Sequence, residues 1–186
     1  MGWTFMEKPS RPKDYLDGQF TWTADDGREN RVLRSAFAGR TEYYAAVETI
    51  YPDGSREVWA AVVLVKFVPK AMDGLTFGYK DMDESAGPYV CRCPETVLRL
   101  LTKPRGEYAE QWRDRCRQWH ERRRAVAALR TGDRVRLIDC RATLGGHAIG
   151  EIVAERMGRK LYFRHPQAGL FRFASLNDWQ WEKVNG

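Results

Sequence analysis

Three carboxylates lie within four residues in the stretch from Phe77 to Tyr89, and they are the first candidates for chemistry. Carboxylates this close together could bind a divalent cation or supply acid–base groups. The EF-hand loop pattern is absent, because a glycine follows Asp83 by four residues rather than three. The alternative, which we favour, is a solvated acidic turn whose aromatic side chains fix it to a sheet. The candidate loop site consists of Tyr79, Lys80, Asp81, Asp83 and Glu84.

Arginine is the second candidate, because six arginines occur between residues 113 and 124 on a segment with helical apolar spacing. Such a face could follow phosphates while Trp112 and Trp119 stack on bases. The strands predicted after it alternate basic and apolar residues, which could extend the basic surface. The simpler explanation is a charged face in solvent and an apolar face in the core. The predicted binding face consists of Arg113, Arg117, Arg123, Arg124, Arg134, Arg136, Arg159, Lys160 and Arg164.

Other reactive residues form no recognisable catalytic pattern. Cys91, Cys93, Cys116 and Cys140 lack the paired spacing of a zinc ribbon, so a zinc site that also uses His120 is less favoured than reduced, buried structural thiols. The sequence contains neither G-x-S-x-G nor H-E-x-x-H. We therefore expect no metal and no cofactor, and we lean against an enzyme.

The charge is divided unevenly along the 186 residues. The net charge of +6 comes from residues 104–186, which hold 17 Lys and Arg against 10 Asp and Glu, whereas residues 1–103 hold 14 against 15. A strongly basic half favours an acidic partner such as nucleic acid. No apolar run approaches the roughly 20 residues of a membrane span, and no secretory signal is evident at the start. We expect a cytoplasmic protein without a membrane partner.

These residues must be positioned by a mixed α+β fold. Strands are predicted over 30–38, 42–51 and 56–68, and the Pro-Asp-Gly-Ser turn from Pro52 joins the last two into an antiparallel meander. Residues 69–93 have the composition of a loop. A short helix follows Pro94, and a long amphipathic helix is predicted over 106–130.

Five short strands after residue 133 predict a small SH3-like barrel. The predicted domains are an α+β unit over 1–103, the Arg-rich helix over 104–130 and the barrel over 131–186.

Several motifs in residues 1–130 also resemble an uncharacterised protein family of bacterial conjugative elements, plasmids and phages. The motifs are Met1-Gly2-Trp3, residues 43–47, residues 59–62, the Phe-Gly-Tyr-Lys-Asp-Met run from Phe77, Gly87-Pro88-Tyr89, Cys93-Pro94, residues 98–101, Trp112-Arg113 and Cys116. The resemblance implies bacterial cytoplasm, mobile DNA and an accessory gene. It implies no activity, so it assigns no functional residue.

The leading hypothesis is a non-enzymatic binding protein of a mobile genetic element, which engages nucleic acid or a nucleoprotein complex through its basic half. One alternative is an anti-defence inhibitor, of anti-CRISPR or anti-restriction type, that binds a host immune protein; a DNA mimic is disfavoured because this chain is basic. The other alternative is a metal-dependent enzyme that uses Asp81, Asp83 and Glu84.

Overall fold

The computed structural model describes residues 2–68, 74–138 and 141–184, and the chain divides into two units, Met1–His120 and Glu121–Gly186. The division falls inside the long helix α3 (Glu107–Ala128), so this helix contributes residues to both units. The domain boundaries predicted from the sequence lie instead near the two ends of this helix, at residues 103/104 and 130/131. None of the described helices is long and apolar enough to cross a membrane.

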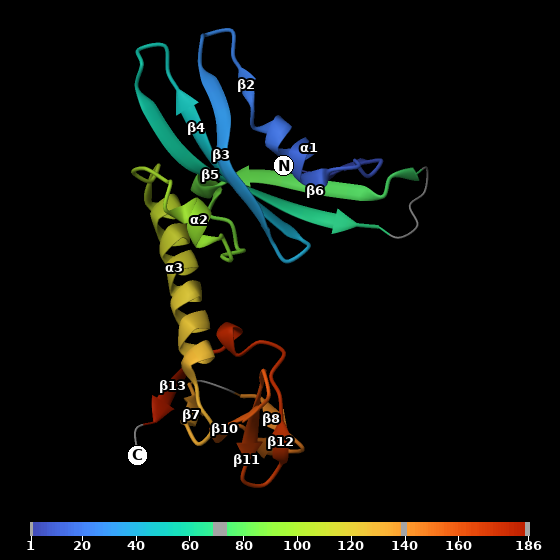
Figure 1. Ribbon diagram of the computed structural model, residues 1–186, viewed down its shortest axis with the longest axis vertical. Coiled ribbons are helices and arrows are strands. Elements are labelled where there is room, and N and C mark those ends of the chain that lie inside the picture. Colours follow the sequence, from blue (N-terminus) through green and yellow to red (C-terminus); the bar gives the residue numbers. More distant parts are fainter. Residues whose placement is uncertain (1, 69–73, 139–140, 185–186) are drawn as a thin grey trace. The chain divides into compact units, whose positions relative to one another are not determined.

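The first unit is built on a six-stranded antiparallel sheet in the order β1-β6-β5-β4-β3-β2 (Figure 1). Its strands are β1 (Thr4–Met6), β2 (Trp22–Thr23), β3 (Glu29–Ala38), β4 (Glu42–Ile50), β5 (Arg56–Phe67) and β6 (Phe77–Asp83). The predicted meander is confirmed, and β4 and β5 are central because β-branched and aromatic residues fill both of their faces. The turn between them needs glycine at Gly54, whose φ is +82°.

Helices cover both faces of this sheet, so the first unit has three layers. On one face, α1 (Pro12–Gln19) packs Leu16 against Tyr43 and Val63. On the other face, α2 (Glu95–Leu98) and the first turns of α3 pack against the next residues of the same strands; Trp112, for example, lies against Tyr44. The side-chain period of two in β4 and β5 therefore creates two separate cores, one on each side of the sheet.

The prediction that residues 69–93 form a loop is wrong for residues 77–83, which form strand β6. Residues 69–73 of that range lie outside the described residues. Residues 77–83 pair with β5 along their full length and with β1 at the other edge. Glycine and aspartate disfavour strands, so local composition obscured β6. Gly78 is needed here, because a Cβ atom at that position would lie 2.6 Å from the ring of Phe5.

Asp17 at the end of α1 fixes this helix to strands β3 and β4. Its carboxylate accepts hydrogen bonds from Ser35 Oγ at 2.6 Å, from Lys13 Nζ at 2.7 Å and from the hydroxyl of Tyr43. Burial raises the pKa of Asp17, but the hydrogen bonds from Lys13, Ser35 and Tyr43 outweigh it, so the pKa lies below its ordinary value of 3.8.

The second unit contains a five-stranded antiparallel sheet in the order β12-β11-β10-β7-β13 (Figure 1). A small separate hairpin, β8–β9, lies between β7 and β10 in the chain. Its strands are β7 (Arg134–Leu137), β8 (Thr143–Leu144), β9 (His147–Ala148), β10 (Glu151–Met157), β11 (Lys160–His165), β12 (Gly169–Phe171) and β13 (Trp181–Val184). Val135, Ile152, Ala154 and Phe163 form its core with Leu129, which follows α3. The 3₁₀-helix η3 (Leu176–Asp178) connects β12 to β13.

Replacing Asp17 by Asn is expected to lower the free energy of unfolding by about 1.5–3 kcal/mol at pH 7, because hydrogen bonds to a charged acceptor are lost. Since the pKa in the folded state is depressed, the stabilisation is present above the unfolded value of 3.8 and is lost as the pH falls through the folded value. Urea denaturation should therefore show the difference between wild type and Asp17→Asn shrinking as the solution is acidified below pH 4.

Asp14→Asn is the matched control on the same helix, because Asp14 is exposed and its one ion pair within the described residues is with the exposed Arg11, at 3.6 Å. Its effect should stay within about 0.5 kcal/mol. Parallel pH curves for Asp17→Asn and wild type would contradict the assigned role of Asp17.

Candidate nucleic-acid interface

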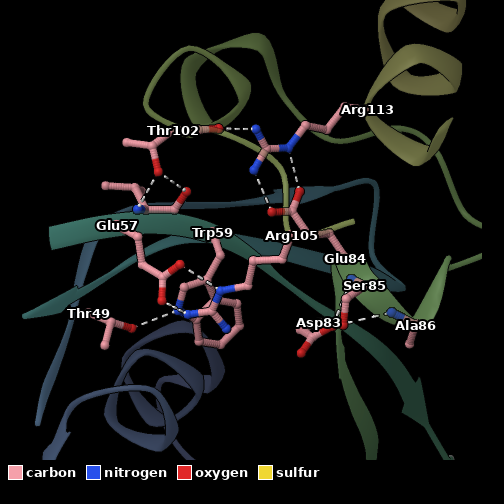
Figure 2. Close-up of polar contacts among 11 residues, drawn as sticks. Thr49, Glu57, Trp59, Asp83, Glu84, Ser85, Ala86, Thr102, Arg105 and Arg113 are labelled. Carbon is pink, nitrogen blue, oxygen red and sulfur yellow. Dashed lines mark hydrogen bonds and ion pairs between the residues drawn. The ribbon is translucent and has the colours of Figure 1, made fainter. Parts of the chain in front are cut away.

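The five residues of the candidate loop site do not converge. Tyr79, Lys80, Asp81 and Asp83 belong to strand β6, whose alternation separates Lys80 from the other three. Asp83 caps the 3₁₀-helix η2 (Glu84–Ala86) by accepting hydrogen bonds from the backbone N–H groups of Ser85 at 2.7 Å and Ala86 at 3.2 Å (Figure 2). These residues serve the fold locally instead of forming one site.

Glu84 is buried in an ion pair with Arg113 of α3 (Figure 2). The side chains are 1% and 4% exposed, and two parallel hydrogen bonds join them: Arg113 Nε to Glu84 Oε2 at 2.6 Å and Arg113 Nη2 to Glu84 Oε1 at 2.5 Å. Arg113 Nη1 also donates to the carbonyl oxygen of Thr102. The prediction that Arg113 lies on a basic surface is therefore wrong, because its helical position faces the sheet and Glu84 neutralises it there.

A second polar cluster in Figure 2 fixes the segment before α3 to strand β5. Arg105 Nε donates to Glu57 at 2.8 Å, and its guanidinium lies 5.4 Å from the ring centroid of Trp59. The indole N–H of Trp59 donates to Thr49 Oγ1 at 2.9 Å. These polar groups are hydrogen-bonded to neighbours from the protein itself, so the cluster stabilises the fold.

Two cysteines of the first unit, Cys93 and Cys116, behave as structural thiols, whereas Cys91 is only half-buried. Cys93 and Cys116 are buried, and burial raises the pKa of the Cys116 thiol to about 12. His120 Nε2 is occupied by the carbonyl oxygen of Cys93 at 2.7 Å. Among the described residues, which exclude Cys140, no group of three or more His, Cys, Asp or Glu side chains could hold a metal ion.

The continuous basic surface expected from the sequence is interrupted by carboxylates. Arg117 pairs with Asp114 on α3 at 2.6 Å. Strand register places the outward arginines of the second sheet beside outward glutamates, as in the pairs Arg134 with Glu151, Arg136 with Glu182 at 3.1 Å, and Arg164 with Glu155 at 2.7 Å. These four arginines are therefore neutralised locally, as expected for cross-strand and helical neighbours.

The two tryptophans predicted to stack on bases also differ from that expectation. Trp112 is fully buried, packs against Tyr44 and donates its indole N–H to the carbonyl oxygen of Val90 at 2.8 Å. Trp119 is half-buried and makes an edge contact with the ring of His120. Trp112 therefore belongs to the core of the first unit and is not available to stack on bases.

Five other basic residues gather around one pocket of about 420 Å³ in the second unit. We call it the basic pocket; it is lined by the cations Arg123, Arg156, Arg159, Lys160 and Arg172. No carboxylate is among its lining residues as far as side chains are described, and the core residues Phe163 and Leu176 contribute apolar wall. Three of the five, Arg123, Arg159 and Lys160, belong to the predicted binding face. Arg124 belongs to that face too, but it is exposed and does not line this pocket.

Each cation reaches the basic pocket from a different element. Arg123 comes from α3, Arg156 from β10 and Lys160 from the start of β11, while Arg172 follows β12. Arg159 lies in the tight turn between β10 and β11, which is possible because Gly158 adopts a φ of +62°. The basic pocket therefore exists only when α3, the β10–β11 hairpin and the end of β12 are folded together.

Two of these cations differ in how firmly they are held. Arg156 donates from Nε to the carbonyl oxygen of Leu129 and from Nη2 to that of Ala127, each at 2.7 Å, so it caps the end of α3. Arg172 makes no ion pair within the described part of the chain, and the same is true of Arg159 and Lys160. Arg156 and Arg172 lie outside the predicted binding face, because only the fold shows that they share a pocket with Lys160.

Replacing Arg113 by Met should lower the free energy of unfolding by about 3–5 kcal/mol, because Glu84 would remain buried without a counterion. The double variant Glu84→Gln/Arg113→Met should lose clearly less than the sum of the two single variants. Guanidinium denaturation, with hydrogen exchange read separately for amides of the first unit, measures both effects.

Arg117→Met provides the control on the same helix, since the exposed pair with Asp114 is expected to contribute less than about 1 kcal/mol. Equal losses of unfolding free energy in Arg113→Met and Arg117→Met would show that the buried pair stabilises the protein no more than the exposed pair does.

One of three comparisons with known proteins gives a match, and it covers the end of the first unit and most of the second. A family model described as a domain of unknown function (DUF6927) matches residues 103–176. Comparison with curated proteins gives no match, and comparison with solved structures gives none either. The matched segment contains all five cations of the basic pocket, so the chain is similar to this domain over the part that builds the candidate site.

Proposed function

We propose that this chain is a non-enzymatic nucleic-acid-binding protein whose second unit takes backbone phosphates into the basic pocket. One observation carries the proposal: five cationic side chains line a pocket that no described carboxylate side chain lines, whereas the arginines on the outer face of the same sheet are paired with glutamates. Arg159, Lys160 and Arg172 make no ion pair within the described residues, so they keep their attraction for an external anion.

The chemistry of the basic pocket suits phosphate. Four of its five cations are arginines, and a guanidinium can donate two parallel hydrogen bonds to phosphate oxygens. Arg156 is already oriented by two carbonyl groups, so it loses little conformational freedom on binding. Arg159, Lys160 and Arg172 are exposed and can reach a phosphate chain that passes over the pocket.

Asn177 favours a nucleotide over a simple anion. Its Oδ1 atom is buried, has no hydrogen-bond partner among the described residues, and belongs to a residue that lines the basic pocket. An acceptor without a partner calls for a donor from the ligand. Sulfate lacks such a donor at neutral pH, whereas nucleotides combine anionic oxygens with N–H groups and, in RNA, a 2′-hydroxyl.

We further propose that the second unit is an SH3-like barrel. The support is its pairing order, in which β7, β10, β11 and β12 pair one after another and the last strand, β13, lies beside β7. The 3₁₀-helix η3 before β13 also agrees with this fold. Small barrels of this kind often bind nucleic acids or peptides, which agrees with the proposed role but does not by itself assign it.

The resemblance of residues 1–130 supports a place for the protein in a bacterial mobile genetic element, where it would engage nucleic acid or a nucleoprotein complex in the cytoplasm. An acidic surface of a host immune protein would fit the same five cations, so the experiment below separates nucleic-acid binding from anti-defence inhibition. A metal-dependent enzyme is disfavoured, because Asp83 caps the 3₁₀-helix η2 and Glu84 is paired with Arg113.

The triple variant Arg159→Gln/Lys160→Gln/Arg172→Gln is expected to weaken binding to labelled single-stranded DNA and RNA of about 12 nucleotides by at least about tenfold near 50 mM salt. The slope of log affinity against log salt concentration should become shallower by about 2, because up to three phosphate contacts are lost. Fluorescence anisotropy at several salt concentrations measures both quantities.

The matched control is Arg134→Gln/Arg136→Gln/Arg164→Gln, which removes the same charge from arginines that already have carboxylate partners. It should change affinity by less than about threefold. Equal losses for the two triple variants would indicate a general field effect and overturn the basic pocket as the site. Failure of the wild type to bind DNA or RNA at low salt, together with capture of an acidic host protein by the same cations, would favour the inhibitor.

A further inference from the structure

A second pocket of about 500 Å³ lies in the second unit, between the end of α3 and strand β13. We call it the α3–β13 pocket. Ala125, Ala128 and Leu129 supply apolar wall from the helix side, while Trp181 and Lys183 contribute from β13. None of its lining residues belongs to the basic pocket, so any ligand here would be independent of the proposed nucleic-acid site.

Two buried donors distinguish this pocket from an ordinary surface hollow. Arg122 Nε and Trp181 Nε1 each carry an N–H, are buried, and have no hydrogen-bond partner among the described residues. Both residues line the α3–β13 pocket. The third unpartnered buried side-chain atom in the described part of the chain is an acceptor, Asn177 Oδ1, in the basic pocket. Donors that the protein leaves unpaired inside a pocket are disfavoured unless a ligand supplies acceptors.

The charges around the pocket limit the acceptor that fits. Two of its carboxylates are already paired, Asp133 with Lys183 at 2.8 Å and Glu182 with Arg136 at 3.1 Å. Arg122 has no ion pair within the described residues. A single negative charge would therefore neutralise Arg122, whereas the second charge of a phosphate would have no partner and would meet repulsion from the carboxylate of Glu121 in the same lining.

We propose that the α3–β13 pocket binds a small organic carboxylate with an apolar body. Its carboxylate oxygens accept hydrogen bonds from Arg122 Nε and from the indole N–H of Trp181, which is a donor only. The apolar body packs against Ala125, Ala128 and Leu129, where burial of apolar surface adds affinity. The proposal does not depend on nucleic-acid binding, because the two pockets share no residue.

The test uses phenylacetate and N-acetyl-leucine as probes, their uncharged amides phenylacetamide and N-acetyl-leucine amide, and acetate as a carboxylate without an apolar body. Titrations of the full chain are followed by the ¹⁵N-edited resonance of the Trp181 indole N–H, which is assigned by its disappearance in Trp181→Phe. The carboxylates should shift this resonance saturably, and the amides and acetate should bind at least about tenfold more weakly.

Two variants remove one donor each while retaining much of the side chain. Arg122→Lys keeps the positive charge but loses the Nε–H, and Trp181→Phe keeps an aromatic ring but loses the indole N–H. Each should weaken binding of phenylacetate by about tenfold, whereas Arg124→Gln, outside the pocket lining, should leave it within about twofold. Binding to Trp181→Phe is read from backbone amide resonances, whose dispersion also reports that the variant is folded.

Three results would overturn the proposal. The first is an indole resonance of Trp181 that neither carboxylate shifts. The second is equal binding of carboxylates and amides, which would assign the pocket to a neutral acceptor. The third is an Arg124→Gln variant that loses as much affinity as Arg122→Lys. Single-stranded DNA should not displace phenylacetate, so failure of one proposed site leaves the other measurable.

Discussion

The buried ion pair between Glu84 and Arg113 is the interaction on which the first unit depends most. Both charges are removed from water, so each requires the other, and the pair connects the end of β6 to α3. Thr102 completes the arrangement by accepting the remaining guanidinium hydrogen bond through its carbonyl oxygen. This one contact explains why residues that resemble an acidic functional loop in sequence serve instead to hold a helix on a sheet.

The same rule of charge neutralisation is the basis for the binding surface that we propose in the second unit. Where an arginine has a glutamate beside it across the sheet, as Arg164 has Glu155, the pair adds little attraction for an external anion. Where no described carboxylate lines the pocket, as around Arg159, Lys160 and Arg172, the positive potential remains available. Arginines occur both in the basic pocket and on the outer face of the sheet. The positions of the carboxylates therefore determine which of these arginines could attract an external anion.

The two pockets of the second unit are chemically complementary. The basic pocket combines cations with one unpartnered acceptor, whereas the α3–β13 pocket combines apolar wall with two unpartnered donors. Residues near the end of α3 line both, but neighbouring helical positions point in different directions, so Arg122 and Arg123 serve different pockets. A small domain can in this way present two ligand sites without sharing a side chain.

The sequence by itself determined the elements whose signal is local. Alternation fixed strands β3, β4 and β5, and the recurrence of Trp112 and Cys116 fixed α3 and its buried side. Only the tertiary structure decided that residues 77–83 form a strand, because their pairing with β5 outweighs their weak local preference. It also decided which charges neutralise each other and which cations share a pocket. Those outcomes depend on strand register and on contacts between segments far apart in the chain, which composition and spacing do not encode.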